Sequence, residues 1–158
     1  MNKKDAAKAI GHIPSGLFIV ATNVGGKKEA YLASWVQQVS FDPLLISIAI
    51  SKERPGYEEI LSGSLFTVNV VGEHEMSYLK YFWSGYDPSD PPFDKIEHSL
   101  TEAGGIVIKE AKSVLECRLK EKVHPGDHEI IIAEVISSYT LNEGASIKVH
   151  TRPSGLDY

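Results

Sequence analysis

The sequence has little of what secreted, membrane-embedded or nucleic-acid-binding proteins need. Cys117 is the single cysteine among 158 residues, so no disulfide can form within the chain. No apolar run approaches the roughly 20 residues of a membrane-spanning helix, and no signal-peptide core follows Met1. Acidic residues (21) outnumber lysine and arginine (16), so no overall basic field is present for nucleic acid. These absences predict a cytoplasmic protein with no membrane and no nucleic-acid partner.

Several catalytic signatures are also missing. Gly25-Gly26 lies within a predicted hairpin rather than at a strand-to-helix turn, which argues against a glycine-rich dinucleotide-binding fold. Ser34 lacks the flanking glycines of a hydrolase nucleophile. His124 and His128 are four residues apart, but Pro125 and Gly126 between them prevent the helix that would align them on a metal. We therefore predict no metal site.

The apolar pattern that is present is that of a single domain over residues 1–158. A hydrophobic fraction of 42% and a charged fraction of 23% are typical of a globular chain that can bury a core. β-branched and alternating apolar runs predict strands over residues 17–22, 29–36, 44–50, 65–71, 106–108, 114–123 and 129–139. Strands outnumber helices and turns are short, which predicts a mainly β fold, a barrel with few helices.

Five local predictions follow from the same patterns. Residues 44–50 form a nearly continuous apolar run, which predicts a strand buried on both faces. Residues 2–10, 54–61 and 74–83 predict helices, the second with a proline in its first turn. Cys117 alternates with Leu115 and Leu119, which favours a core thiol over a catalytic one.

A polar segment between two predicted strands is the first candidate site. It is rich in hydroxyl and amide side chains where the chain leaves the sheet, and such a segment can offer backbone groups to the polar edge of a flat heterocycle. The alternative interpretation is an ordinary polar strand end. The candidate residues here are Ser34, Trp35, Val36, Gln37, Gln38 and Val39.

The second candidate combines two cations, two hydroxyls and a predicted helix start within seven residues. A helix N-terminus with flanking cations can hold a phosphate dianion, although a solvated basic turn is equally consistent with the pattern. The candidate residues are Ser51, Lys52, Arg54 and Tyr57.

The third candidate is His128, which follows the turn at Pro125-Gly126 and precedes a strand. An imidazole held at the mouth of a site can hydrogen-bond a ligand or pair with a phosphate, while the alternative is a histidine that only caps its own turn. The other histidines are scattered and are interpreted as surface residues: His12, His74, His98 and His150.

Taken in order along nearly the whole chain, these segments resemble the flavin-reductase-like proteins. The similar stretches are residues 11–22, 33–50, 63–70, 117–135 with Gly126-Asp127-His128, and a tail from 150 to 158 that resembles the end of the reductase domain fused to diflavin flavodiiron proteins. The resemblance implies an FMN-binding split barrel of Greek-key type, dimeric, with the flavin in a groove at the subunit interface. The aromatic segment of residues 78–86 is a candidate to cover apolar surface in that homodimer.

Carried over residue by residue, the resemblance implies that Ser34 to Val39 line the isoalloxazine. Ser51, Lys52, Arg54 and Tyr57 would hold the phosphate, and His128 would meet the nicotinamide. The protein would then pass electrons from NADH or NADPH through FMN to a flavin or redox-protein acceptor. Trp35 and Gln37-Gln38 depart from the usual flavin loop. Two alternatives remain: a flavoredoxin-like carrier with permanently bound FMN, and a non-enzymatic barrel that binds another ligand or partner.

Overall fold

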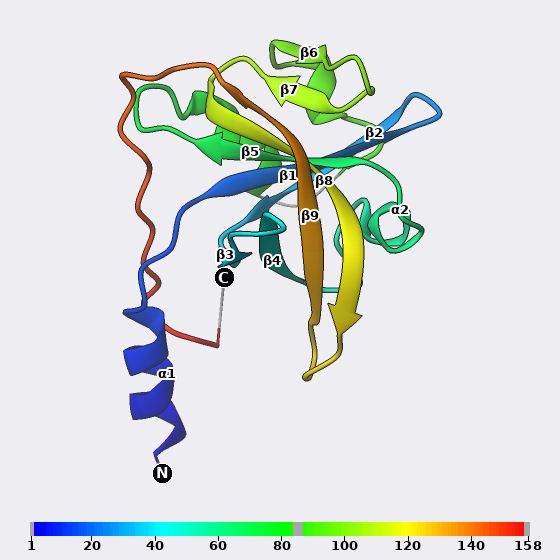
Figure 1. The fold of residues 1–158 in the computed structure, drawn as a ribbon. Coiled ribbons are helices and arrows are strands. Elements are labelled where there is room, and N and C mark those ends of the chain that lie inside the picture. The colour runs from blue at the N-terminus through cyan, green and yellow to red at the C-terminus, as the bar shows by residue number, and fades with distance from the viewer. Residues whose placement is uncertain (1, 84–86, 157–158) are drawn as a thin grey trace.

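The computed structural model describes residues 2–83 and 87–156. In it, seven antiparallel strands form one sheet, in the order β2-β1-β5-β8-β9-β4-β3 (Figure 1). A second sheet pairs β6 with β7. The strands are β1 (Phe18–Val24), β2 (Lys27–Ala33), β3 (Val36–Ser40), β4 (Leu45–Ile50), β5 (Phe66–Val71), β6 (His98–Leu100), β7 (Ile106–Ile108), β8 (Ala111–Val123) and β9 (Glu129–Thr140). The helices are α1 (Lys3–Gly11), α2 (Tyr57–Leu61), η1 (Ser77–Leu79), α3 (Lys80–Trp83) and η2 (Pro92–Asp94). This confirms the prediction of a mainly β fold with few helices.

The two edge strands of the large sheet, β2 and β3, follow each other directly in the chain. Only Ser34 and Trp35 separate them, so the sheet must curl until its edges approach each other. The curled sheet encloses a core to which both edges and the middle contribute, including Tyr31 of β2, Ile48 of β4 and Ile131 of β9. The result is a barrel with a split between β2 and β3.

The other face of the sheet packs against the segment that leads from β5 to β8. In β1, Val20 points into the barrel, whereas Ile19 and Ala21 point to this outer core. Phe82 and Phe93 cover the outer core with ring centroids 6.0 Å apart. Successive residues of the strand therefore face two apolar layers in turn, and neither face of the strand is turned to solvent.

A buried amide fastens the small sheet to the large one. The Asn69 side chain donates to the carbonyl of Ile106 (3.2 Å) and accepts from the amide of Ile108 (2.8 Å). The Thr67 hydroxyl donates to the same Ile106 carbonyl (2.7 Å). Because Asn69 and Thr67 are about 1% exposed or less, these bonds satisfy polar groups that burial would otherwise leave unpaired.

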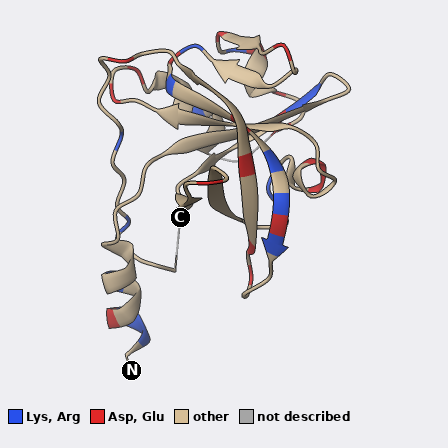
Figure 2. Ribbon diagram, viewed as in Figure 1, with Lys and Arg blue, Asp and Glu red and all other residues tan. Residues whose placement is uncertain are grey.

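Strands β8 and β9 form a long hairpin whose far end leaves the sheet. Charged residues lie along the end of β8, where most of the strand is exposed to solvent (Figure 2). Nearer the sheet, Cys117 is fully buried in the barrel core, and burial raises the pKa of its thiol to about 12. The prediction that Cys117 is a core residue is confirmed.

Two local predictions were wrong in their details, and one strand was not predicted. Strand β4 is not buried on both faces: its even-numbered residues face the barrel core and its odd-numbered residues are half-buried. Residues 74–83 do not form one helix but the two short turns η1 and α3. Strand β3 went unpredicted, because its polar residues lie on an edge and carry no apolar alternation.

Candidate functional site

The break between β2 and β3 opens a small cavity at the split of the barrel. The backbone carbonyl of Trp35 accepts from the amide of Ala49 (3.1 Å), which fixes the two-residue connection against β4. The end of β4 and the turn after it form the opposite wall. The cavity is lined by Tyr31, Leu32, Ala33, Ser34, Trp35, Ala49, Ile50, Ser51 and Arg54. Four of the predicted binding residues, Ser34, Trp35, Ser51 and Arg54, are therefore brought together.

The Trp35 indole joins this cavity to two other segments. Its centroid lies 4.9 Å from that of the His128 imidazole, with the planes inclined at 56°. The guanidinium carbon of Arg152 lies 5.0 Å from the Trp35 ring centroid, within the range of a cation–π contact. The Trp35 side chain thus contacts two residues that lie about 90 and 120 positions further along the sequence.

His128 is held from two sides. Its Nδ1 lies 2.7 Å from Oδ1 of Asp127, and its side chain is 17% exposed. This hydrogen bond and the imidazole charge lower the pKa of the Asp127 carboxyl. The pKa of Glu53 is also lowered, chiefly by a hydrogen bond from the Ser51 hydroxyl and to a lesser degree by His128. The imidazole therefore lies at the edge of the cavity beside the turn that carries Ser51.

Arg54 belongs to a turn and not to a helix, which corrects the prediction of a helix over residues 54–61. The amide of Arg54 donates to Ser51 (3.1 Å), and that of Tyr57 donates to Arg54 (3.2 Å). Gly56 then adopts a left-handed conformation (φ 78°) and packs so closely that a Cβ would lie 2.8 Å from the Thr22 hydroxyl oxygen. Because α2 begins after this glycine and has five residues, a helix N-terminus does not supply the anion site.

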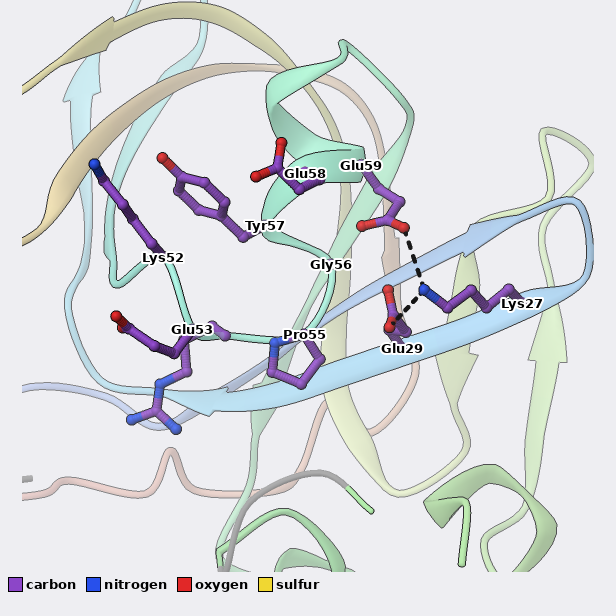
Figure 3. Close-up of a pocket in the computed structure, with 10 residues that line it drawn as sticks. Lys27, Glu29, Lys52, Glu53, Pro55, Gly56, Tyr57, Glu58 and Glu59 are labelled. Carbon is purple, nitrogen blue, oxygen red and sulfur yellow. Dashed lines mark ion pairs between the residues drawn. The ribbon is translucent and has the colours of Figure 1, made fainter. Parts of the chain in front are cut away.

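Lys52 and Tyr57 line a second cavity, which Arg54 also borders but which shares no other residue with the cavity at the split (Figure 3). Lys27 there makes ion pairs with Glu29 (2.9 Å) and Glu59 (3.5 Å). Burial, followed by the nearby Glu129 and Glu58 carboxylates, raises the pKa of the Tyr57 phenol. With carboxylates from Glu29, Glu53, Glu58 and Glu59 on its wall, this second cavity is a poor place for a phosphate dianion.

The remaining predicted residues form the edge strand β3. Val36 packs against the barrel core, whereas Gln37, Gln38 and Val39 are exposed. The Gln37 carbonyl accepts from the Ser47 hydroxyl (3.4 Å), and the pairing with β4 shifts between Gln38 and Ser40. An edge strand offers one row of backbone N–H and C=O groups outward, which fits the predicted recognition of a flat polar ligand.

The C-terminal tail contributes to this site, which the sequence did not predict. His150, interpreted as a surface residue, is half-buried and pairs with Ser15 through two backbone hydrogen bonds (2.8 and 2.9 Å). It lines a cavity with Ser34 and Arg54, and Trp83 and Phe82 also contribute to that cavity. No local pattern identifies a lone histidine 116 positions from Ser34 as its neighbour.

The described residues contain no cluster of three or more histidine, cysteine, aspartate or glutamate side chains placed to hold a metal ion. Within the same residues, no helix has the length and apolar character needed to cross a membrane.

Comparison with known proteins gives a family match over most of the chain. Residues 10–152 match the family described as "Flavin reductase like domain". A diflavin flavoprotein of Nostoc sp. is 34% identical over 155 residues, and Diflavin flavoprotein A 1 of Synechocystis sp. is 30% identical over 155 residues. The matches cover 98% of this chain, but the chain spans only 27% of the length of each of these relatives.

Solved structures share the fold. The NADH:FAD oxidoreductase SgcE6 of Streptomyces globisporus C-1027 has a TM-score of 0.82 at 23% identity, with 91% of this chain and 85% of that chain covered. A flavoredoxin from Methanosarcina acetivorans has a TM-score of 0.72 at 22% identity, with 82% and 70% covered. At these identities the likeness establishes the split-barrel architecture.

Proposed function

Because the chain belongs to the flavin reductase-like family, we propose that it binds FMN at the split of the barrel and transfers electrons from NADH or NADPH to an acceptor. The observation that carries the proposal is the convergence at one break in the sheet of two hydroxyls, one guanidinium and one indole: Ser34, Ser51, Arg54 and Trp35. These groups fit the ligand, because FMN combines a flat heterocycle, a polar edge and a phosphate.

Each group has a distinct task in this proposal. The outward backbone groups of β3 and the Ser34 hydroxyl bind the polar edge of the isoalloxazine, and Trp35 packs against it. Arg54 binds the phosphate, with the Ser51 hydroxyl beside it. When bound, FMN supplies the redox chemistry by accepting a hydride from the nicotinamide and passing two electrons onward. His128, fixed by Asp127 and Trp35, orients the donor.

A flavoredoxin-like carrier, which keeps FMN bound and takes electrons from a protein, is the second candidate. Its support is the shared barrel of the Methanosarcina acetivorans flavoredoxin. The two functions use the same cavity and differ in the electron donor. Oxidation of NADH and NADPH by the purified protein, measured with and without added FMN, separates them. Protein that binds no flavin at all would favour the third possibility, a barrel that binds another ligand or partner.

We expect the substitution Arg54→Ala to weaken FMN binding by about 1.5–3 kcal/mol, the usual contribution of a hydrogen bond to a charged group. Riboflavin lacks the phosphate and should lose almost no affinity. Isothermal titration of both ligands measures the difference.

Lys52→Ala is the matched control for Arg54→Ala, because both residues border the acidic cavity but Arg54 also lines the cavity at the split and Lys52 does not. It should change FMN affinity much less than Arg54→Ala does. An equal loss of FMN affinity in the two variants would contradict a phosphate site in the cavity at the split.

The second prediction concerns His128. We expect His128→Ala to slow nicotinamide-driven flavin reduction roughly tenfold, or to raise the KM for the donor, which corresponds to about 1.4 kcal/mol of lost transition-state stabilisation. FMN affinity should stay within about twofold of the parent, because the imidazole contacts the donor. Stopped-flow reduction by NADH, NADPH and dithionite distinguishes these steps. Loss of FMN, or unchanged rates with every reductant, would show that His128 has another role.

We further propose that two copies associate through the β3–β4 turn and the neighbouring parts of β3 and β9. Large apolar side chains are exposed there, and exposed apolar patches mark interaction surfaces: Val39 (50%) of β3, Phe41 (87%) and Leu44 (53%) of the turn, and Ile136 (48%) of β9. The aromatic segment of residues 78–86 is less suited than expected, because Tyr78 and Phe82 are buried in the outer core and residues 84–86 lie outside the described part.

Sedimentation equilibrium should therefore give a particle of about twice the 17.4 kDa chain mass. Phe41→Ser should shift the equilibrium toward the monomer while the far-ultraviolet circular dichroism stays unchanged. A parent protein that is monomeric at every concentration and still binds FMN tightly would contradict a homodimer.

A further inference from the structure

The C-terminal tail is bound to the N-terminal segment where it carries Arg152. The tail runs from the end of β9 to α1 (Figure 1). Just before Arg152, His150 pairs with Ser15 through two backbone hydrogen bonds (2.8 and 2.9 Å). The Arg152 amide itself donates to the Gly11 carbonyl at the end of α1 (3.0 Å). The backbone of Arg152 is therefore held by the first turns of the chain.

Glycines allow the two segments to approach at backbone distance. A Cβ on Gly11 would lie 2.5 Å from the carbonyl oxygen of Arg152. Further along the tail, the Gly155 amide donates to the Ala7 carbonyl (2.6 Å), and a Cβ on Gly155 would lie 2.6 Å from a side-chain carbon of Ile10. Because neither contact leaves room for a side chain, packing as well as hydrogen bonding fixes the path of the tail on both sides of Arg152.

This fixed backbone places the Arg152 side chain against Trp35. The guanidinium carbon lies 5.0 Å from the centroid of the indole, which also contacts the His128 imidazole. Trp35 lines the cavity at the split, whereas Arg152 is not among the described residues that line it. Arg152 therefore acts on the cavity through the indole and not by direct contact with what the cavity holds.

The positive charge of Arg152 influences its surroundings. The pKa of the His150 imidazole is lowered first by burial and then by the positive charges of Arg152 and Lys148. Arg54 adds a second guanidinium, which lines the cavity at the split. Both arginines are half-buried, so water and salt screen their charges less than those of exposed side chains.

The carboxylates of this region are more exposed than the two arginines. The Asp127 side chain is 94% exposed and lies 2.7 Å from Nδ1 of His128. Glu53 is also exposed and accepts a hydrogen bond from the Ser51 hydroxyl. Solvent screens both carboxylates, so the two half-buried guanidinium groups set the sign of the local potential.

Hydride transfer changes the charge of the flavin ring. In the proposed reaction the nicotinamide loses a hydride and becomes a cation, while the neutral oxidised isoalloxazine gains the hydride and with it one negative charge. A fixed cation near the ring stabilises the reduced flavin and has little effect on the neutral oxidised flavin. Such a cation therefore raises the reduction potential of the bound flavin.

We propose that Arg152 is a positioning residue for the flavin: it holds the Trp35 indole against the isoalloxazine, and its charge favours the reduced flavin over the oxidised flavin. The inference rests on the proposed function, in which FMN occupies the cavity at the split. The contact between the tail and α1 then affects the reactivity of the flavin, because it sets the position of Arg152 relative to Trp35.

The direct test is the reduction potential of the FMN-bound protein, measured by equilibration with a dye of known potential. We expect Arg152→Gln to lower the ratio of reduced-flavin to oxidised-flavin affinity roughly tenfold, which for two electrons is a decrease of about 30 mV. Arg152→Lys keeps the charge but not the planar guanidinium, and it should restore most of the potential.

Gly11→Ala tests the tail contact without removing the guanidinium. Its methyl group would collide with the Arg152 carbonyl, so Arg152 must move, and the potential should fall as it does in Arg152→Gln. Gly144→Ala is the matched control, because a Cβ at this second glycine of the C-terminal region would meet nothing within 4 Å. It should leave the potential unchanged.

A second measurement needs no flavin. The chain has two tryptophans, Trp35 and Trp83, so the emission of a Trp83→Phe background reports Trp35 alone. We expect Arg152→Gln in this background to increase acrylamide quenching of the emission about twofold, because the half-buried indole loses a contact that holds it in place. Gly144→Ala should not change the quenching.

An unchanged potential in Arg152→Gln would overturn the inference. Equal losses of potential in Arg152→Gln and Arg152→Lys would also overturn it, because the charge would then have no part in the effect. Unchanged quenching of Trp35 in Arg152→Gln would show that Arg152 does not position the indole. A protein that binds no FMN refutes the proposed function instead, and the quenching measurement alone then decides whether Arg152 positions Trp35.

Discussion

The direct connection of two edge strands through Ser34 and Trp35 is the constraint on which the rest of the structure depends. Because two residues span the distance between β2 and β3, the seven-stranded sheet must close on itself, and its two edges contribute to one core. Ser34 and Trp35 belong to neither strand, so the sheet is interrupted where they lie. The same short connection therefore closes the barrel and opens the cavity at the split.

Trp35 extends that constraint to the other functional residues. Its indole contacts His128 from the β8–β9 hairpin and Arg152 from the tail, so both segments are held near the cavity by one side chain. The left-handed Gly56, packed on Thr22, fixes the turn that presents Arg54 on the opposite wall. The site is thus assembled from four segments that are distant in sequence, each held by a backbone bond or a ring contact.

Most strands were predictable from the sequence because their β-branched and apolar residues are buried. Ile19 and Val20, for example, are neighbours in β1 and face two different apolar layers. The polar strand β3 was not, because edge position leaves no apolar signature. The helix predicted at Arg54 failed because Gly56 enforces a turn that propensity does not reveal. Arg54 borders both the acidic cavity and the cavity at the split, whereas Lys52 borders the acidic one, and this arrangement depends on the same turn. The approach of His150 and Arg152 is long-range, and no local pattern encodes it.

The central claim is that the split between β2 and β3 holds the flavin, and a crystal structure of the protein with FMN tests it most directly. We predict the isoalloxazine beside Ser34 and Trp35, with the phosphate within hydrogen-bonding distance of the Arg54 guanidinium. FMN located instead in the acidic cavity beside Lys52 and Glu58, with the split unchanged, would contradict the account.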